Sequence, residues 1–320
     1  LTKKNKKYFP LEKSKLLYYI LLYSIILKKK NKKMYLAPLN FDRFFKKVFS
    51  DLKIAKRFLE DFLEVEITDI QQLKEKHKIT DDANPVEFDY RCKIDNNYII
   101  IDMQQWYKSD IIKRFYLYHC LNTGLQLEKL PQKLLIPQQI VKDVNKKQKD
   151  YERIEPVYTL IWMVDDTLGF EDDIAQYSMN HESLLDFINN EELWQNEEIT
   201  EILKHREEVL KKLSNNSKNL KFISKNKLVF MLQKNIVKNL ENNREHKKYE
   251  DWFDFATRTL NKSNTKEDFK KFETDKVFSE VMKRLKRDTL NNDDIKYIDE
   301  EDEYKRLLLD FYMKVFEEKK

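Results

Sequence analysis

Two aspartates and a glutamine stand on adjoining segments whose patterns predict β-strands. Asp89 belongs to the first segment, residues 86–93, and Asp102 and Gln104 belong to the second, residues 99–104. Polar and apolar residues alternate in both segments, as they do in strands that bury one face. An Asp-Asn-Asn stretch between them is typical of a tight turn, because these residue types tolerate left-handed backbone. The sequence therefore predicts a hairpin that carries oxygen-rich side chains on both arms.

The position of the turn decides whether these side chains meet. If Asn96 and Asn97 form the turn, Asp89 lies opposite Gln104, and Asp102 is its diagonal neighbour on the same face, with Cα atoms about 7–8 Å apart. Two carboxylates at that separation can share a hard cation such as Mg²⁺. A turn longer by one residue would send the two aspartates to opposite faces. The hairpin alone is equally compatible with a solvated strand face that binds nothing.

Four motifs occur in order between residues 40 and 119. They are NFDRFFKKVFSD (40–51), FDYRCK (88–93), IIDMQQW (100–106) and IIKRFYLYH (111–119). Their order and spacing resemble the PD-(D/E)XK nuclease superfamily and, within it, the PD-(D/E)XK nuclease family transposases, or Rpn-type recombination-promoting nucleases. The resemblance covers roughly residues 34–190. It implies an α/β fold with a restriction-endonuclease-like core, in which helices flank a mixed central sheet.

The resemblance also implies an activity, which is Mg²⁺- or Mn²⁺-dependent cleavage of DNA linked to recombination or mobile elements. It gives Asp89, Asp102 and Gln104 catalytic roles. The two aspartates would hold the metal with the backbone carbonyl of Met103, and Asp42 would reach it from the first helix. Gln104 stands where the superfamily has Lys, and Asp102 stands where this branch more often has Glu, so catalytic competence stays open. The alternatives are a degenerate nuclease fold that binds DNA or protein without cutting, and a helical interaction protein without a nuclease core.

Two of these residues have structural interpretations as well. Asp42 falls in the first turn of a helix that Asn40 would cap, where the helix dipole favours an acid. Arg114, near the start of a helix expected at 110–130, would contact a DNA phosphate, orient Gln104, or pair with a local carboxylate. Phosphate contacts give salt-sensitive binding with little sequence specificity. The residues expected to make them are Lys46, Lys47, Lys108, Lys113 and Arg114.

The net charge of the 320-residue chain gives no general argument for nucleic acid. The total is +5, but residues 1–33 hold eleven Lys and one Glu, and subtracting their +10 leaves −5 from Met34 onward. The apolar run 16–27 in this first segment is shorter than the roughly 20 residues that span a bilayer. We interpret residues 1–33 as a non-native upstream extension, with a membrane-surface anchor as the alternative and no membrane association otherwise. Two cysteines without a metal spacing favour a reduced, cytoplasmic protein.

The remaining patterns divide the chain into two regions after the extension. Residues 34–190 form the nuclease-like domain, with a buried strand expected at 157–164. Residues 191–320 form a helical C-terminal region, in which 226–240 is expected to be an amphipathic helix and the acidic run 291–303 a separator. DNA is the expected partner of the first region. The second would carry a homodimer or protein contact.

Overall fold

The computed structural model describes most of the chain from Met34 onward. The described residues are 34–78, 85–105, 110–134, 147–165, 172–178, 200–201, 203–204, 207, 225–240 and 245–317. The Lys-rich segment 1–33 lies outside them. No helix within these ranges combines the length and the apolar character needed to cross a bilayer.

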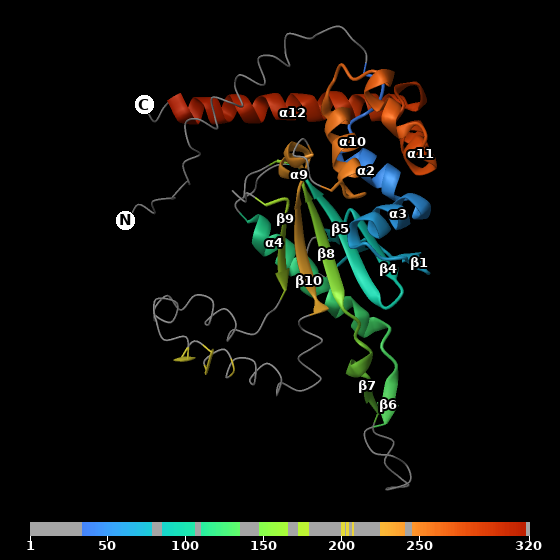
Figure 1. The fold of residues 1–320 in the computed structure, drawn as a ribbon, viewed down its shortest axis with the longest axis vertical. Coiled ribbons are helices and arrows are strands. Elements are labelled where there is room, and N and C mark those ends of the chain that lie inside the picture. The colour runs from blue at the N-terminus through green and yellow to red at the C-terminus, as the bar shows by residue number, and fades with distance from the viewer. Residues whose placement is uncertain are drawn as a thin grey trace.

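A mixed six-stranded sheet forms the centre of the protein (Figure 1). Its middle strands β5, β8 and β10 run parallel to one another. Antiparallel strands extend the sheet on both sides. This agrees with the expected mixed sheet of an α/β protein. In sheet order the strands are β1 (Ile70–Gln72), β4 (Tyr90–Ile94), β5 (Asn97–Gln104), β8 (Val157–Met163), β10 (Lys227–Leu232) and β9 (Ile174–Ser178).

Helices cover both faces of the sheet, so its central strands are apolar on both sides. Ile101 of β5 and Trp162 of β8 belong to a core cluster shared with α2, α3, α10 and α11, whereas Ile161 and Met163 pack beneath α4. The expected buried strand at 157–164 is confirmed. The helices on the first face are α2 (Asp42–Phe49), α3 (Leu52–Leu63), α10 (Glu250–Leu260) and α11 (Lys276–Leu285), and the opposite helix is α4 (Ile111–Gly124).

The hairpin of β4 and β5 differs from the predicted one in its register. The turn falls on Asp95 and Asn96, and Asp95 adopts the left-handed backbone, with φ 43°. Tyr90 therefore pairs with Ile101, which shifts the expected pairing by two residues. A shift of two preserves the side-chain face, because strand side chains alternate with a period of two. The prediction that Asp89 lies opposite Gln104 is wrong, and the pairing of β4 with β5 ends before it reaches Asp89.

Short elements lie around this frame. The expected first strand, 86–93, is interrupted at Phe88 and Asp89, and its start forms a separate strand that pairs outside the central sheet. The two small sheets consist of β2 (Lys76–His77) with β3 (Val86–Glu87), and β6 (Gln132–Leu134) with β7 (Lys147–Lys149). The short 3₁₀ helices are Leu125–Glu128, Tyr151–Arg153, Lys266–Phe272 and Arg287–Thr289.

The C-terminal part of the chain is not purely helical, which corrects our expectation. Residues 227–232 form β10, which lies in the central sheet between β8 and β9. Only the following residues, Gln233–Asn239, form a helix, α9. The boundary expected at residue 190 lies outside the described residues, but the sheet takes a strand from well beyond it.

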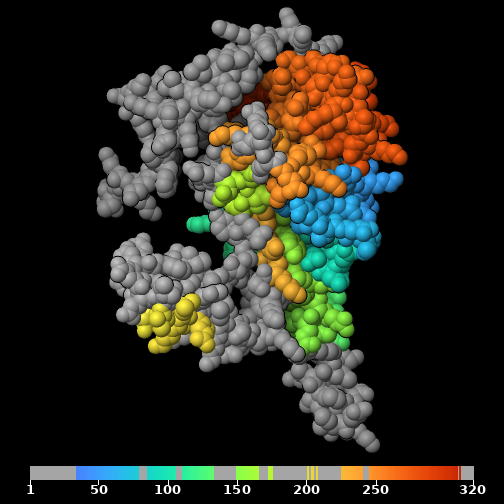
Figure 2. Space-filling model, viewed as in Figure 1, coloured from blue at the N-terminus to red at the C-terminus, as the bar shows by residue number. Residues whose placement is uncertain are grey.

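The last helix, α12, runs from Asn292 to Glu317. It includes the acidic run 291–303, which we had expected to separate helices rather than belong to one. Tyr297 anchors its first half, because its ring packs edge-on against Phe41 and Phe44 of the α2 region. In Figure 2 the orange residues of the C-terminal helices form a continuous surface with the blue residues of α2 and α3. In Figure 1, α12 crosses beyond the end of the sheet at which β5 finishes.

Candidate active site

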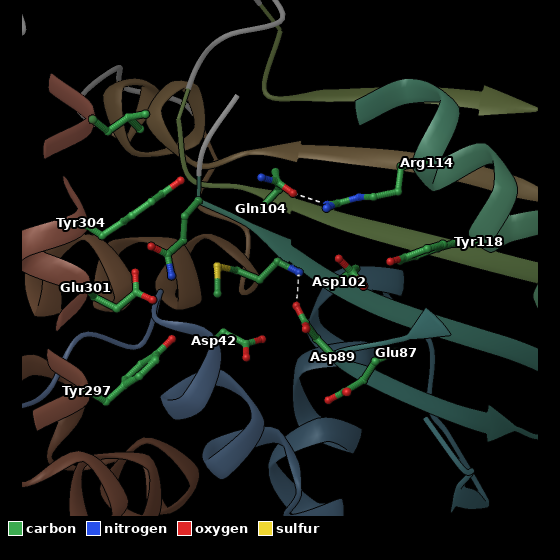
Figure 3. Close-up of a pocket in the computed structure, with 13 residues that line it drawn as sticks. Asp42, Glu87, Asp89, Asp102, Gln104, Arg114, Tyr118, Tyr297, Glu301 and Tyr304 are labelled. Carbon is green, nitrogen blue, oxygen red and sulfur yellow. Dashed lines mark hydrogen bonds between the residues drawn. The ribbon is translucent and has the colours of Figure 1, made fainter. Parts of the chain in front are cut away.

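A pocket of about 460 Å³ opens at the C-terminal end of β5. Acidic, aromatic and amide side chains from five parts of the fold converge on it (Figure 3). They come from β5, from the start of α2, from the first half of α4, from the segment before β4, and from α12. The lining residues are Asp42, Glu87, Asp89, Asp102, Met103, Gln104, Gln105, Arg114, Tyr118, Tyr297, Glu301, Tyr304 and Leu308.

Asp89 and Asp102 both line this pocket despite the changed register. Because the pairing with β4 stops at Ile101, the backbone N–H of Met103 has no strand partner on that side within the part of the chain that the structure describes. It donates instead to Oδ2 of Asp89 at 2.8 Å, which satisfies a buried donor and fixes the carboxylate. The N–H and C=O of one residue in a strand point to the same side, so the Met103 carbonyl is directed toward the same edge of β5.

The two aspartates are poorly solvated, which changes their acidity. Burial raises the pKa of Asp102 to about 7, while the positive charge of Arg114 acts in the opposite direction. Burial also raises the pKa of Asp89 well above its usual value, and the nearby carboxylates of Asp102 and Asp42 raise it further. Two buried acids that oppose each other's ionisation form a site short of positive charge.

Gln104 and Arg114 form the opposite wall of the pocket. The guanidinium of Arg114 donates a hydrogen bond to Oε1 of Gln104. It also lies over the rings of Phe115 and Tyr118, at 4.5 and 5.8 Å from their centroids, which holds the side chain in place. Among the described residues, the buried Nε of Arg114 has no hydrogen-bond acceptor. Arg114 is therefore a hydrogen-bond partner of Gln104, which is one of the three roles considered from the sequence. Its Nε–H remains without an acceptor among the described residues.

The expected DNA-contacting cations that the structure describes are not grouped on one open surface. Lys46 lies against carboxylates at the pocket, as close as 3.0 Å to Glu87, and Lys47 of the same helix pairs with Asp294 at 3.1 Å. Lys113 is exposed on α4. Lys108 lies outside the described residues. Asn40, expected as the cap of α2, is buried and donates to Gln233 instead, while Asp42 begins the helix as expected.

Sequence reasoning missed the wall formed by α12. Tyr297, Glu301, Tyr304 and Leu308 line the pocket and lie on one helix face, because their spacing of four, three and four residues follows the helical repeat. That stripe was visible in the sequence, but nothing near it pointed to a site 200 residues earlier. Glu87 was also missed as a pocket residue, although it stands two residues before Asp89 and therefore on the same face of the predicted strand.

The chemistry of this pocket fits a divalent cation. Among the described residues, no group of three or more His, Cys, Asp or Glu side chains is placed to hold a metal ion. Mg²⁺ does not require such a group, because it keeps several waters and usually binds through one or two carboxylates. Asp89 and Asp102 supply two, and their mutual repulsion is what a cation would relieve. Asp42, expected as an additional ligand, is half exposed and pairs with Lys46 at 3.2 Å.

Comparison with known proteins adds no relative. No protein-family model matches the chain, and no curated protein or solved structure matches it either.

Proposed function

We propose that the protein hydrolyses phosphodiester bonds in DNA with Mg²⁺ or Mn²⁺ as cofactor. The observation that carries the proposal is the convergence of Asp89 and Asp102, two buried carboxylates from separate segments, on one pocket. The order of the four sequence motifs supports the same assignment. That resemblance also suggests the setting, which is recombination or the movement of mobile elements.

Each residue of the pocket has a distinct task in this proposal. Asp89 and Asp102 would hold the cation, with the Met103 carbonyl directed to the same edge. When bound, the cation would polarise the phosphate and lower the pKa of an attacking water. Gln104 takes up no proton and carries no charge, so it orients water or phosphate by hydrogen bonds, and Arg114 fixes its amide group.

Arg114 also offers a contact for the substrate. Its buried Nε–H has no acceptor among the described residues, and a guanidinium is well suited to a phosphate oxygen. The aromatic rings that hold Arg114 reduce its freedom before the substrate arrives, which lowers the entropic cost of binding.

A second candidate function is a nuclease-like fold that binds DNA or protein without cutting it. Two observations favour it. Position 104 carries a neutral glutamine, and Lys46 already provides positive charge to the acidic side of the pocket. This candidate shares the fold and the binding surface with the first, and it differs in the absence of metal-dependent turnover.

A plasmid-nicking assay separates the two. We expect the purified protein to convert supercoiled plasmid to the open-circular form in Mg²⁺ or Mn²⁺ but not in EDTA. Asp102→Asn should lower the rate by at least about 100-fold, because one of the two cation-binding carboxylates is lost. The control is Asp288→Asn, which removes an exposed carboxylate that does not line the pocket. Absence of metal-dependent nicking by the wild type would contradict the proposed activity and favour the second candidate.

A further inference from the structure

Lys46 lies on the acidic side of the pocket, between carboxylates that would otherwise repel one another. Its Nζ lies 3.2 Å from Oδ1 of Asp42, 3.0 Å from Oε1 of Glu87 and 3.5 Å from Oδ1 of Asp89. These carboxylates come from α2, β3 and the segment before β4, so one ammonium group joins three separate elements. Of the three, Asp89 is also one of the two carboxylates that we propose hold the divalent cation.

The sequence explains why Lys46 and not its neighbour takes this position. Lys46 stands one helical turn after Asp42, which puts both side chains on the same face of α2. Lys47 is rotated by about 100° around the helix and pairs with Asp294 of α12 instead. Figure 3 shows Asp42, Glu87 and Asp89 directed toward one another at this side of the pocket.

An ammonium and a divalent cation compete for the same carboxylate oxygens. The ammonium is a compact point charge with three rotatable donors, so it can serve several carboxylates and can also move away on its flexible stem. The Lys46 side chain is 31% exposed, which leaves it a path toward solvent. A cation that takes Asp89 as a ligand must therefore displace this ion pair, and the partly exposed side chain of Lys46 can move toward solvent when it does.

We propose that Lys46 is a built-in counter-ion of this site, which competes with the divalent cation for Asp89 and is displaced when the cation binds. This inference rests on the proposed metal-dependent function. It adds that Lys46 offsets part of the negative charge of the site before the metal arrives, and that displacement leaves a positive charge at the rim of the pocket for an anionic substrate.

Mn²⁺ binding measured by calorimetry tests this competition. We expect Lys46→Met to bind Mn²⁺ about fivefold or more tightly than the wild type, because the competing charge is removed, and Lys46→Arg to bind it no more tightly. Lys56→Met is the matched control: Lys56 is 35% exposed and also forms a pair with an acid four residues away, Glu60, but on α3. Its Mn²⁺ affinity should equal that of the wild type.

Thermal unfolding is the second measurement. If Lys46 had only a structural role, Mn²⁺ would raise the unfolding temperature of Lys46→Met and of the wild type equally. In EDTA, Lys46→Met should unfold at a lower temperature than the wild type, because the carboxylates lose their counter-ion. Mn²⁺ should raise the unfolding temperature of Lys46→Met by more than that of the wild type. An equal loss with and without Mn²⁺ would overturn the proposal, as would an unchanged Mn²⁺ affinity or no Mn²⁺ binding by either protein.

The two proposals fail in different ways. If the wild type nicks plasmid and Lys46→Met binds Mn²⁺ with wild-type affinity, the counter-ion role is wrong and the nuclease assignment stands. If Lys46→Met binds Mn²⁺ more tightly but the wild type never nicks DNA, the counter-ion role stands and the nuclease assignment is wrong.

Discussion

Asp102 shows how a residue can oppose stability where it supports chemistry. Its side chain is buried at the end of β5, in a position where the neighbouring strand residues are apolar. An ionised carboxylate is unfavourable there, and the pKa of about 7 expresses that cost. Strongly perturbed carboxylates of this kind gather at functional sites more often than elsewhere. The molecule retains a charge that its fold would be more stable without.

This cost predicts the pH dependence of an Asp102→Asn variant without metal. The pKa of Asp102 is higher in the folded than in the unfolded chain, so stability falls as pH rises from about 4 to about 7, and the full cost is present above pH 7. Asp102→Asn should therefore raise the free energy of unfolding by about 2 kcal/mol at pH 8, and most of that gain should disappear at pH 5. Thermal or urea unfolding in EDTA at both pH values measures it. A destabilised variant at pH 8, or the same gain at both values, would show that burial does not act in this way.

The sequence predicted which residues line this site, but it did not predict how the two strands pair. Asp89, Asp102, Gln104, Arg114 and Asp42 all line one pocket, although the turn was placed one residue too far along. These side chains still share a pocket because that error shifts the pairing by two residues and keeps every side chain on its face. It could not supply the hydrogen bond from Met103 to Asp89, which exists only because the pairing of β4 ends early.

At the scale of single elements, short polar residues fix where helices begin. Asp51 separates α2 from α3 and accepts hydrogen bonds from the backbone N–H groups of Lys53 and Ile54. Its other carboxylate oxygen receives a hydrogen bond from Arg284 of α11 at 2.6 Å. One side chain therefore begins α3 and ties it to a helix more than 200 residues later.

Substitutions at Asp51 should separate these two contributions. Asp51→Ala removes the cap and the ion pair and should lower the free energy of unfolding by about 1–2 kcal/mol. Asp51→Asn keeps a capping oxygen and should lose less than half as much, because a partly exposed ion pair contributes little. Urea unfolding at neutral pH measures both. Equal losses for the two variants would mean that the ion pair, and not the cap, stabilises this junction.

Sequence patterns misassigned two elements of the C-terminal region, β10 and the start of α12. Residues 227–232 are almost entirely apolar, so they show no period of two, and the polar residues that follow continue as a true helix. Periodicity alone does not distinguish a strand buried on both faces from part of a buried helix. The acidic run in α12 was misassigned for a different reason: its many charges suggested a solvated joint, whereas Tyr297 and Ile298 hold it against the core.

At the scale of the whole molecule, distant segments share one core. The main apolar cluster combines residues of α2 and α3, the sheet, and the helices after residue 245. Gln233 is a polar junction inside it: its Oε1 accepts from Asn40 and Trp162, at 2.9 and 2.6 Å, and its amide donates to Thr257. A buried, hydrogen-bonded network of this kind favours one arrangement of the elements over others.

The shared core predicts that the N-terminal region does not fold alone. A fragment of residues 34–190 lacks β10 and the helices that bury Trp162, so its sheet loses a central strand and much of one covering layer. We expect no cooperative thermal transition by circular dichroism. A fragment of residues 34–320 should unfold cooperatively and is the control. A cooperative transition in the shorter fragment would show that the folding unit ends before β10.

The early end of the β4 pairing also bears on how the protein avoids unwanted assembly. Beyond Ile101, no strand of the described residues pairs with this edge of β5, and unpaired edges recruit strands from other chains. The Asp89 carboxylate occupies the Met103 N–H, and a negative charge there discourages an incoming strand. Asp89→Ala would therefore leave a strand edge that can pair with another chain, in addition to altering the pocket. Aggregation of this variant would say nothing about catalysis. Asparagine, which retains an accepting oxygen, is the substitution that keeps the edge closed.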